Sequence, residues 1–249
     1  LKDLSSFFAL VKLIRKIKPD VIHTHTAKAG VLGRLASMVA GGGAKRVHTF
    51  HGHLLHGYFN ALKRAIMIAT ERILALFTYR IIAIGNVVKN DLLAVGIGSA
   101  KKFLVFFPGL PEPKTVDRDA KRNELGLDPA TLYCTFVGRP TYIKRPERLL
   151  DVAVLLEARG LKVHFLVAGE GEQFESSKER ARHDQLPMTF LGWRSDTDAI
   201  LAASDIAILC SDNEGIPLTL IQAAQAGLPI VATNVGSISD IVVDGTNGL

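Results

Sequence analysis

The chain has 249 residues, enough for two domains of ordinary size, and its 48% hydrophobic and 22% charged residues are typical of a soluble globular protein. Its two cysteines form neither a disulfide framework nor a metal-ligand spacing, which predicts a reducing compartment. The formal net charge is +6, but residues 1–110 carry +12 and residues 111–249 carry −6.

The basic first half indicates an anionic partner. Nucleic acid fits poorly, because the aromatic residues are mostly Phe within apolar runs, without a stacking pattern among the basic residues. An anionic membrane surface or a phosphate-bearing lipid fits better. A solvated basic face without a partner is the alternative.

The first residues do not predict a signal peptide. No transmembrane helix is predicted, since the longest apolar stretch, Ala65 to Phe77, is broken by Glu71 and Arg72. The chain starts without Met, and both ends are interpreted as cut from something longer. We expect a cytoplasmic protein, with peripheral attachment to the inner face of the plasma membrane as an open option.

Short apolar runs alternate with helical patterns along the chain. Strands are predicted at 21–23, 47–50, 81–84, 103–106, 134–137, 163–167, 189–191, 206–210 and 229–232, with amphipathic helices between them, for example at 60–77 and 146–159. This rhythm predicts an α/β fold with two Rossmann-like lobes whose parallel sheets face an interdomain cleft. The Pro-rich segment 108–114 breaks the rhythm where the charge changes sign, so the predicted domains are 1–110 and 111–249.

Histidines cluster near two strand ends of the first domain. His51 lies just past a strand, beside the flexible Gly52, where its ring can hydrogen-bond a sugar hydroxyl. The pairs His23/His25 and His51/His53 are expected to place their members on different faces. No carboxylate lies between them at a metal-ligand spacing, so no metal site is predicted.

The segment 137–146 begins where a buried strand ends and leads into a helix near Pro146. Gly138 lets the backbone turn sharply, and Arg139 and Lys144 can reach into the crevice. A planar guanidinium and a point charge together suit a diphosphate. A surface loop with two solvated cations is the alternative.

Two further strand ends carry weaker signals. Gly169 and Gly171 follow the strand that ends at Ala168, and they allow a ligand to approach closely. The backbone at Trp193 and Arg194 can meet a base after the next strand. Trp193 fits a packing role equally well.

The segment 211–222 follows the apolar run 206–210 and contains an acidic side chain, a glycine and a helix start. Helix N–H groups at the carboxyl end of a strand can hold a phosphate, and Pro217 is tolerated in the first turn. Glu214 cannot favour a phosphate, so its expected partners are sugar hydroxyls. A capped strand–loop–helix connection is the alternative.

Taken together, these segments resemble retaining glycosyltransferases of family 4, which have the two-lobed GT-B fold. The resemblance covers nearly the whole chain and rests on 19–25, 49–52, 137–139 with Lys144, 168–171, 191–193 and 214–215. The segments 23–30 and 49–53 look most like bacterial members that build polysaccharide or glycan on a polyprenyl-diphosphate carrier.

The resemblance implies transfer of a sugar from a nucleotide-diphosphate sugar, with UDP as the expected nucleotide, to a glycan or polyprenyl-diphosphate-linked acceptor. Configuration would be retained, and neither a metal nor another cofactor would be needed. It implies catalytic roles for His51 near the reacting centre, Glu214 at the transferred sugar, and Arg139 and Lys144 at the diphosphate. The amides of Gly215, Ile216, Pro217 and Leu218 match the segment that approaches the sugar and the diphosphate.

Two departures from the family are expected. Full members begin with a strand and a glycine-bearing loop that lines the cleft and end with helices that brace the lobes, and this chain is expected to lack both. The second acid of the E-x7-E motif is Gln222 here, although this carboxylate usually accepts hydrogen bonds from both ribose hydroxyls. A glutamine oxygen can accept, but its NH2 group donates, so weaker nucleotide binding is expected. Two alternatives stay open, a nucleotide-sugar epimerase of GT-B fold and a non-catalytic nucleotide-sugar-binding remnant.

Overall fold

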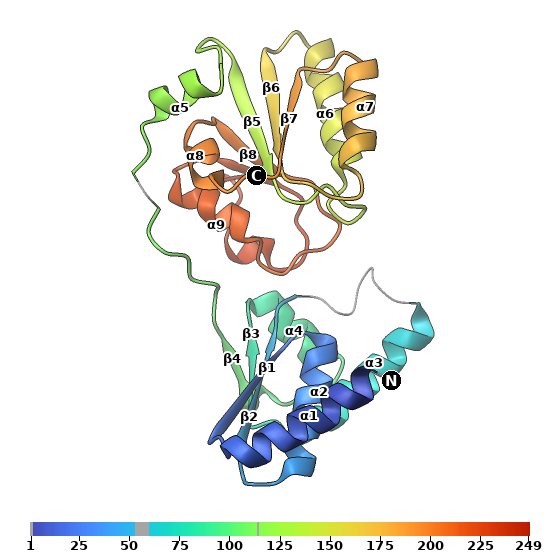
Figure 1. Cartoon of the computed structure of the whole chain (residues 1–249). Coiled ribbons are helices and arrows are strands. Elements are labelled where there is room, and N and C mark those ends of the chain that lie inside the picture. Colours follow the sequence, from blue (N-terminus) through green and yellow to red (C-terminus); the bar gives the residue numbers. More distant parts are fainter. Residues whose placement is uncertain (1, 53–59, 114) are drawn as a thin grey trace. The chain divides into compact units, whose positions relative to one another are not determined.

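The chain consists of two compact units, Leu1–Pro108 (unit 1) and Gly109–Leu249 (unit 2), each built around its own parallel sheet (Figure 1). The computed structural model describes residues 2–52, 60–113 and 115–249. The division falls inside the Pro-rich segment in which the sequence placed the domain boundary. No helix within these ranges combines the length and apolar character needed to cross a bilayer.

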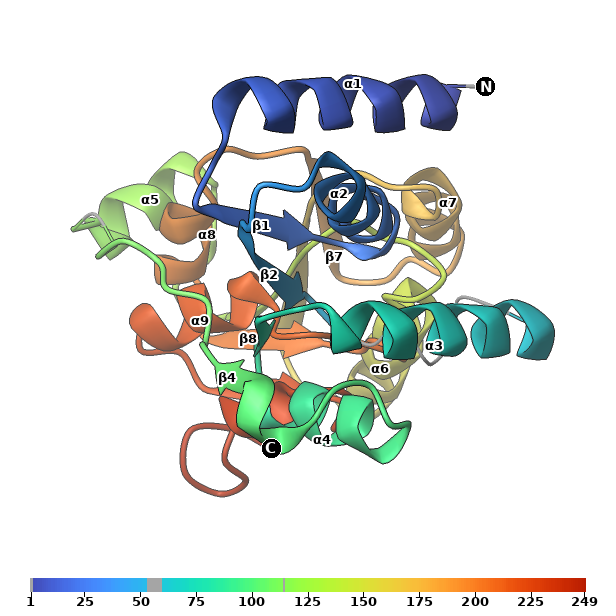
Figure 2. The same ribbon diagram turned by 90° about the horizontal axis from the view of Figure 1, so that it is seen from below.

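Unit 1 has a four-stranded parallel sheet in the order β1-β2-β3-β4. The strands are β1 (Val21–His25), β2 (Lys45–Phe50), β3 (Arg80–Ala83) and β4 (Phe103–Val105), and the prediction of all four is confirmed. Its helices are α1 (Lys2–Ile17), α2 (Ala27–Ala40), α3 (Ala61–Leu76), α4 (Asn86–Ala94) and the 3-10 turn η1 (Ala100–Lys102). Helix α1 packs on α2, and α2 packs on α3 (Figure 2).

Two polar side chains of α2 and α3 are buried as an ion pair. One terminal nitrogen of Arg34 donates to both carboxylate oxygens of Glu71, at 2.7 and 2.8 Å, and each side chain is only 1% exposed. The Arg34 Nε also donates to the carbonyl of Gly30 at 2.9 Å. Removing one partner of such a pair leaves an uncompensated buried charge, so the pair fixes α2 against α3.

His48 of β2 is fully buried beneath α2. Its Nδ1 lies 2.9 Å from the Thr24 hydroxyl, and its Nε2 has no hydrogen-bond partner among the described residues. A Cβ on Gly30 would lie 2.4 Å from the imidazole, so glycine is required where the helix crosses the ring. Burial, followed by the positive charges of Arg34 and His25, lowers the pKa of His48 to about 3.

Unit 2 has a five-stranded parallel sheet in the order β7-β6-β5-β8-β9. The strands are β5 (Leu132–Val137), β6 (Val163–Ala168), β7 (Met188–Gly192), β8 (Ile206–Leu209) and β9 (Ile230–Ala232), each matching a predicted strand. The chain builds outward from β5 through β6 and β7 on one side, and through β8 and β9 on the other. Sheets of this kind bind ligands where the order reverses, here at the carboxyl ends of β5 and β8.

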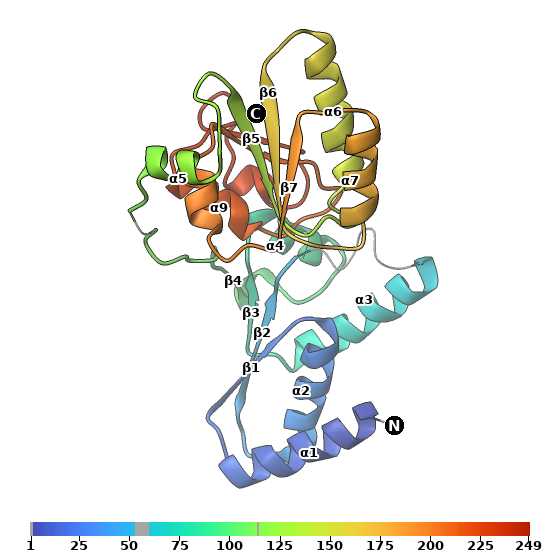
Figure 3. The same ribbon diagram turned by 45° about the horizontal axis from the view of Figure 1, so that its top comes forward.

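Helices cover both faces of this sheet. They are α5 (Arg118–Glu124), α6 (Pro146–Ala158), α7 (Phe174–His183), α8 (Thr197–Ala202), α9 (Leu218–Gln225) and the 3-10 turn η2 (Ile238–Asp240). Figures 1 and 3 show α6 and α7 together on one face, and α5, α8 and α9 on the other. Helix α9 begins one residue after Pro217, which is its N-cap rather than part of its first turn.

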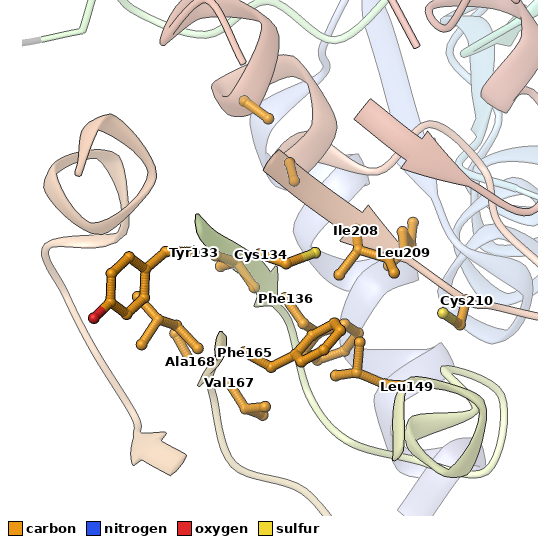
Figure 4. Packing of buried hydrophobic residues seen from close by; sticks show 14 of the residues in the cluster. Tyr133, Cys134, Phe136, Leu149, Phe165, Val167, Ala168, Ile208, Leu209 and Cys210 are labelled. Atoms are coloured by element: carbon orange, nitrogen blue, oxygen red, sulfur yellow. The ribbon is translucent and has the colours of Figure 1, made fainter. Parts of the chain in front are cut away.

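The core of unit 2 forms around β5, where Tyr133 to Val137 are all buried (Figure 4). A strand covered on both faces is rich in apolar residues, which makes β5 predictable from the sequence, and its one polar member, Thr135, hydrogen-bonds the Ser204 hydroxyl at 2.5 Å. Cys134 and Cys210 are free thiols within this core, 5% and 7% exposed. Burial raises the pKa of the Cys134 thiol to about 12.

The depressed pKa of His48 gives a test by pH. The unfolded chain binds a proton at this ring below about pH 6.5 and the folded chain does not, so stability should fall as the pH falls from 6.5 toward 3. The loss from this group is at most about 1.4 kcal/mol for each pH unit. In the folded protein, the NMR signals of the His48 ring should not titrate between pH 8 and pH 5, and His48→Gln should flatten the pH dependence of the unfolding free energy. A ring titration midpoint near 6.5 would contradict the assignment.

Candidate functional site

A lysine and a glutamate from different loops meet at the switch point of the unit 2 sheet. The ammonium of Lys144, from the loop after β5, forms an ion pair with Oε1 of Glu214, from the loop after β8. The Ser211 hydroxyl donates to the same oxygen at 2.5 Å. The Lys144 side chain is 25% exposed and that of Glu214 is 10% exposed, so the pair is partly withdrawn from water.

The two loops are also joined through their backbones. The amide of Asp212 donates to the carbonyl of Ile143 at 2.8 Å, next to the ion pair. Arg148 of α6 donates to the carbonyl of Cys210 at 3.0 Å and pairs with the Asp212 carboxylate at 2.6 Å. Lys144 and Glu214 therefore stand on a connected framework rather than on independent surface loops.

Arg139 is an exposed cation on the loop that carries Lys144. Its side chain makes no hydrogen bond or ion pair with any residue in the described part of the chain, and the residues flanking it are held in place. The amide of Gly138 donates to the carbonyl of Ala168 at 2.9 Å, and the carbonyl of Pro140 accepts from Gln173 at 2.9 Å. A guanidinium on a fixed backbone can bind an anion at a smaller entropic cost.

Gly215, Ile216, Pro217 and Leu218 form the entry to α9. The Gly215 carbonyl accepts from the amide of Ser237 at 3.1 Å, Ile216 and Pro217 are buried, and the Leu218 side chain is exposed. Pro217 supplies no side-chain hydrogen bond to the helix start. The first amides of α9 thus have no side-chain cap from this residue, as an anion site requires.

Gly169 and Gly171 serve a packing contact between loops. A Cβ on Gly169 would lie 2.0 Å from the Gly138 carbonyl oxygen, and one on Gly171 would lie 2.5 Å from that of Pro140. The sequence indicated that these glycines admit a ligand. In the structure, the backbone they admit is that of the loop carrying Arg139.

Trp193 and Arg194 follow β7 at the edge of the sheet. The Trp193 side chain is 70% exposed, so it does not pack in the core of unit 2. Arg194 forms two hydrogen bonds with Asp196, at 2.8 and 2.6 Å, and Lys121 binds the same carboxylate at 2.7 Å. These bonds, that of Arg194 foremost, hold the pKa of Asp196 well below its usual range.

Gln222 lies on α9 with its amide directed at α8. Its Nε2 donates to Oδ1 of Asp198 at 2.8 Å and lies 3.4 Å from the Thr197 hydroxyl. The NH2 group of Gln222, which a glutamate at this position would lack, therefore donates to a carboxylate in this structure.

His51 belongs to unit 1 and lies just past β2, as predicted. Its Nε2 is 2.8 Å from Nδ1 of His25, and the rings of His25 and His23 lie side by side, tilted by 40° with centroids 4.2 Å apart. The expectation that His23 and His25 occupy different faces is wrong, because residues two apart in a strand share a face. Burial, followed by the His25 charge, lowers the pKa of His51. The prediction for the pair His51 and His53 cannot be compared with the structure, since His53 lies outside the described residues.

Within the described ranges, no group of three or more His, Cys, Asp or Glu side chains is arranged to hold a metal ion.

Two residues that support Glu214 had no role in the sequence analysis. Ser211 lies three residues before Glu214 at the strand end, so the spacing alone could have suggested the contact. Gly236 could not be found in this way: its φ is 57°, and a Cβ there would lie 1.8 Å from the Glu214 carbonyl oxygen. This contact joins residues that are distant in sequence and depends on the fold of the segment after β9.

Two family descriptions cover almost the whole chain. "Glycosyltransferase Family 4" matches residues 1–108, and "Glycosyl transferases group 1" matches residues 117–249. The second match includes Arg139, Lys144, Glu214 and Gln222.

Among curated proteins, the chain is 31% identical to UDP-Gal:alpha-D-GlcNAc-diphosphoundecaprenol alpha-1,3-galactosyltransferase of Escherichia coli, over 100% of this chain and 66% of that protein. It is 34% identical to D-inositol 3-phosphate glycosyltransferase of Rhodococcus erythropolis, over 53% of this chain and 33% of that protein. The chain thus spans less than two thirds of the length of these relatives.

Among solved structures, Anabaena Alr3699/HepE in complex with UDP and glucose superimposes with a TM-score of 0.83 at 22% identity, over 96% of this chain and 66% of that chain. The lipopolysaccharide outer core galactosyltransferase WaaB, in its apo form, gives a TM-score of 0.73 at 20% identity, over 99% of this chain and 65% of that chain. The prediction of the fold is confirmed, and the chain belongs to the group 1 glycosyltransferases of family 4, with two α/β units of the GT-B type.

Proposed function

We propose that the protein transfers a sugar from a UDP-sugar to a glycan or polyprenyl-diphosphate-linked acceptor with retention of configuration. The Lys144–Glu214 pair at the switch point of unit 2, with Arg139 exposed on the same loop, carries this proposal. A diphosphate needs cations that remain available, and a sugar needs a carboxylate whose charge does not repel the phosphates. Lys144 meets both needs. One of the three donors of its ammonium pairs with Glu214 and offsets the carboxylate charge, and the other two donors remain for the phosphates.

In the proposed complex, Arg139, Lys144 and the first amides of α9 bind the diphosphate. Glu214, fixed through Oε1 by Lys144 and Ser211, accepts sugar hydroxyls at Oε2. The bond from the anomeric carbon to the diphosphate breaks as the acceptor hydroxyl forms its bond on the same face, and the hydroxyl proton passes to the departing phosphate oxygen. Fixed cations and amides stabilise the charge that develops on the diphosphate, so the reaction is proposed to need no metal or other cofactor.

His51 is proposed to hydrogen-bond the transferred sugar, and its contact with His25 would orient the ring. The +12 charge of residues 1–110 supports peripheral docking on an anionic membrane, where a polyprenyl-linked acceptor would be embedded. A cytoplasmic location follows from this proposal, since nucleotide sugars are the donors.

The direct test is transfer from UDP-galactose to a synthetic lipid-diphosphate-GlcNAc acceptor, the acceptor type in the name of the Escherichia coli relative. We expect UDP release that depends on acceptor, and an α-linked product by NMR. An epimerised sugar formed without acceptor would assign the protein to the epimerases. UDP binding without transfer, when the protein is tested at the full length of its relatives, would leave it as a binding protein.

Arg139→Ala should weaken UDP binding by roughly 1.5–3 kcal/mol, because it removes a charge-assisted contact to the diphosphate. Calorimetric titration with UDP measures the effect. Arg159→Ala is the matched control. Arg139 lies on the loop before α6, and Arg159 directly follows the carboxyl end of that helix; both are exposed, and neither has a side-chain partner in the described part of the chain. Equal affinities for UDP in both variants would show that Arg139 is not at the donor site.

Gln222→Glu alone should fail to improve UDP binding, although it restores the family's second acid. The new carboxylate would replace an amide nitrogen that lies 2.8 Å from the Asp198 carboxylate, and like charges repel at that distance. Adding Asp198→Asn removes the repulsion, and the double variant should gain about 1 kcal/mol with UDP. The gain should be absent with 2′,3′-dideoxy-UDP. A gain that is equal for both nucleotides would show that residue 222 does not face the ribose.

A further inference from the structure

A pocket of about 670 Å³ opens in unit 1 at the amino ends of its strands. Five cations line it: Lys45 and Arg46 begin β2, Arg80 begins β3, and Lys101 and Lys102 lie in η1, just before β4. The amino ends of neighbouring parallel strands meet at one edge of a sheet, so these side chains converge. His51 lies at the opposite edge, after the carboxyl end of β2.

The pocket has no neutralising charge of its own. None of the residues described as lining it is Asp or Glu. Asp20, which precedes β1 at the same edge, contributes a backbone carbonyl to Lys45, and its carboxylate forms no ion pair with a described residue. The other carboxylates of unit 1 include Glu71, paired with Arg34, and Asp3, paired with Lys28. A concave surface with charges of one sign concentrates ions of the other sign.

Several of these cations are held in place by the protein. Lys102 donates to the carbonyls of Ala75 and Leu76, at 2.7 and 2.9 Å, where α3 ends. The Arg46 Nε donates to the carbonyl of Phe77 at 2.7 Å, which leaves its two terminal nitrogens without a partner in the described ranges.

Tyr79 gathers two more of the cations. The Lys45 ammonium lies 5.0 Å, and the Arg80 guanidinium 4.7 Å, from the centre of its ring. Lys101 has no described partner. Capping of α3 thus explains Lys102 and one nitrogen of Arg46. Arg80 also donates from one terminal nitrogen to the Tyr79 carbonyl at 3.3 Å. Lys101 and the terminal nitrogens of Arg46 have no partner in the described ranges, and no carboxylate neutralises Lys45 or Arg80.

We propose that this pocket binds a phosphate-bearing anion, with Arg46, Arg80 and Lys101 supplying the contacts. Two guanidinium groups and an ammonium on a fixed backbone match the several acceptor oxygens of a phosphate group. The rim also exposes apolar side chains, since Leu76 and Tyr79 are 72% and 47% exposed. The shared chemistry is a phosphate joined to an apolar body, and it can come from an anionic lipid headgroup or from a soluble phosphate ester. The site is separate from the proposed donor site and does not depend on it.

A titration with pyrophosphate, monitored by the backbone amide NMR shifts of the whole chain, tests the pocket. We expect shifts at Ala44, Tyr79 and Ser99 that saturate, and an affinity at these amides reduced by roughly tenfold or more in Arg80→Gln/Lys101→Gln. The control is Lys12→Gln/Lys16→Gln, which removes the same charge from exposed positions on α1 of the same unit and should leave the affinity unchanged. Any binding in unit 2 shifts different amides. Absence of saturable shifts at the pocket, or equal weakening in both variants, would overturn the proposal.

Sedimentation with vesicles separates the two sources of phosphate. If the ligand is a lipid headgroup, Arg80→Gln/Lys101→Gln should lose binding to phosphatidylglycerol vesicles that Lys12→Gln/Lys16→Gln retains, and neither should bind phosphatidylcholine vesicles. Equal vesicle binding by the two variants, together with pyrophosphate binding at the pocket, would support a soluble phosphate ester.

Discussion

The ion pair between Lys144 and Glu214 is the interaction on which the arrangement of the unit 2 site depends. It joins the loops that leave the sheet on either side of its switch point, and it keeps a carboxylate beside the place where a diphosphate would bind. Alone, that carboxylate would repel the phosphates. With an ammonium between them the charges would alternate, which is how the proposed donor site would hold a sugar and a diphosphate together.

The loops that carry this pair are joined to their neighbours by backbone hydrogen bonds of glycine residues. Gly138 is bonded to the end of β6, Gly169 to Gly192, and Gly215 to Ser237, each through backbone groups at 3.1 Å or less. Such contacts cost little side-chain entropy and leave the surface free for a ligand. The glycines are therefore part of the framework that holds Arg139 and Glu214 at fixed positions.

Much of this architecture could be predicted from the sequence. The strands can be predicted because a parallel strand covered on both faces is rich in apolar residues, as in Tyr133 to Val137 with Thr135 as its one polar member, and because helical patterns separate the strands. Arg139, Lys144 and Glu214 are predicted as site residues because each lies in a segment that follows a strand, and the carboxyl ends of strands are where α/β sheets bind ligands.

Contacts between residues that are distant in the sequence could not be predicted. Neither the approach of Gly236 to Glu214 nor the bond from Gln222 to Asp198 leaves a local pattern. The prediction for His23 and His25 is wrong for a different reason: residues two apart in a strand share a face, and this spacing is visible in the sequence.

The buried cysteines have a practical consequence. A thiol reacts with electrophiles through its thiolate, and the pKa of Cys134 near 12, together with the 5% and 7% exposure of the two side chains, keeps both native thiols protonated and shielded. A single cysteine introduced on the surface would be labelled ahead of both. The natural chain is thus a ready background for site-specific attachment of fluorophores or spin labels, without prior removal of its own sulfur atoms.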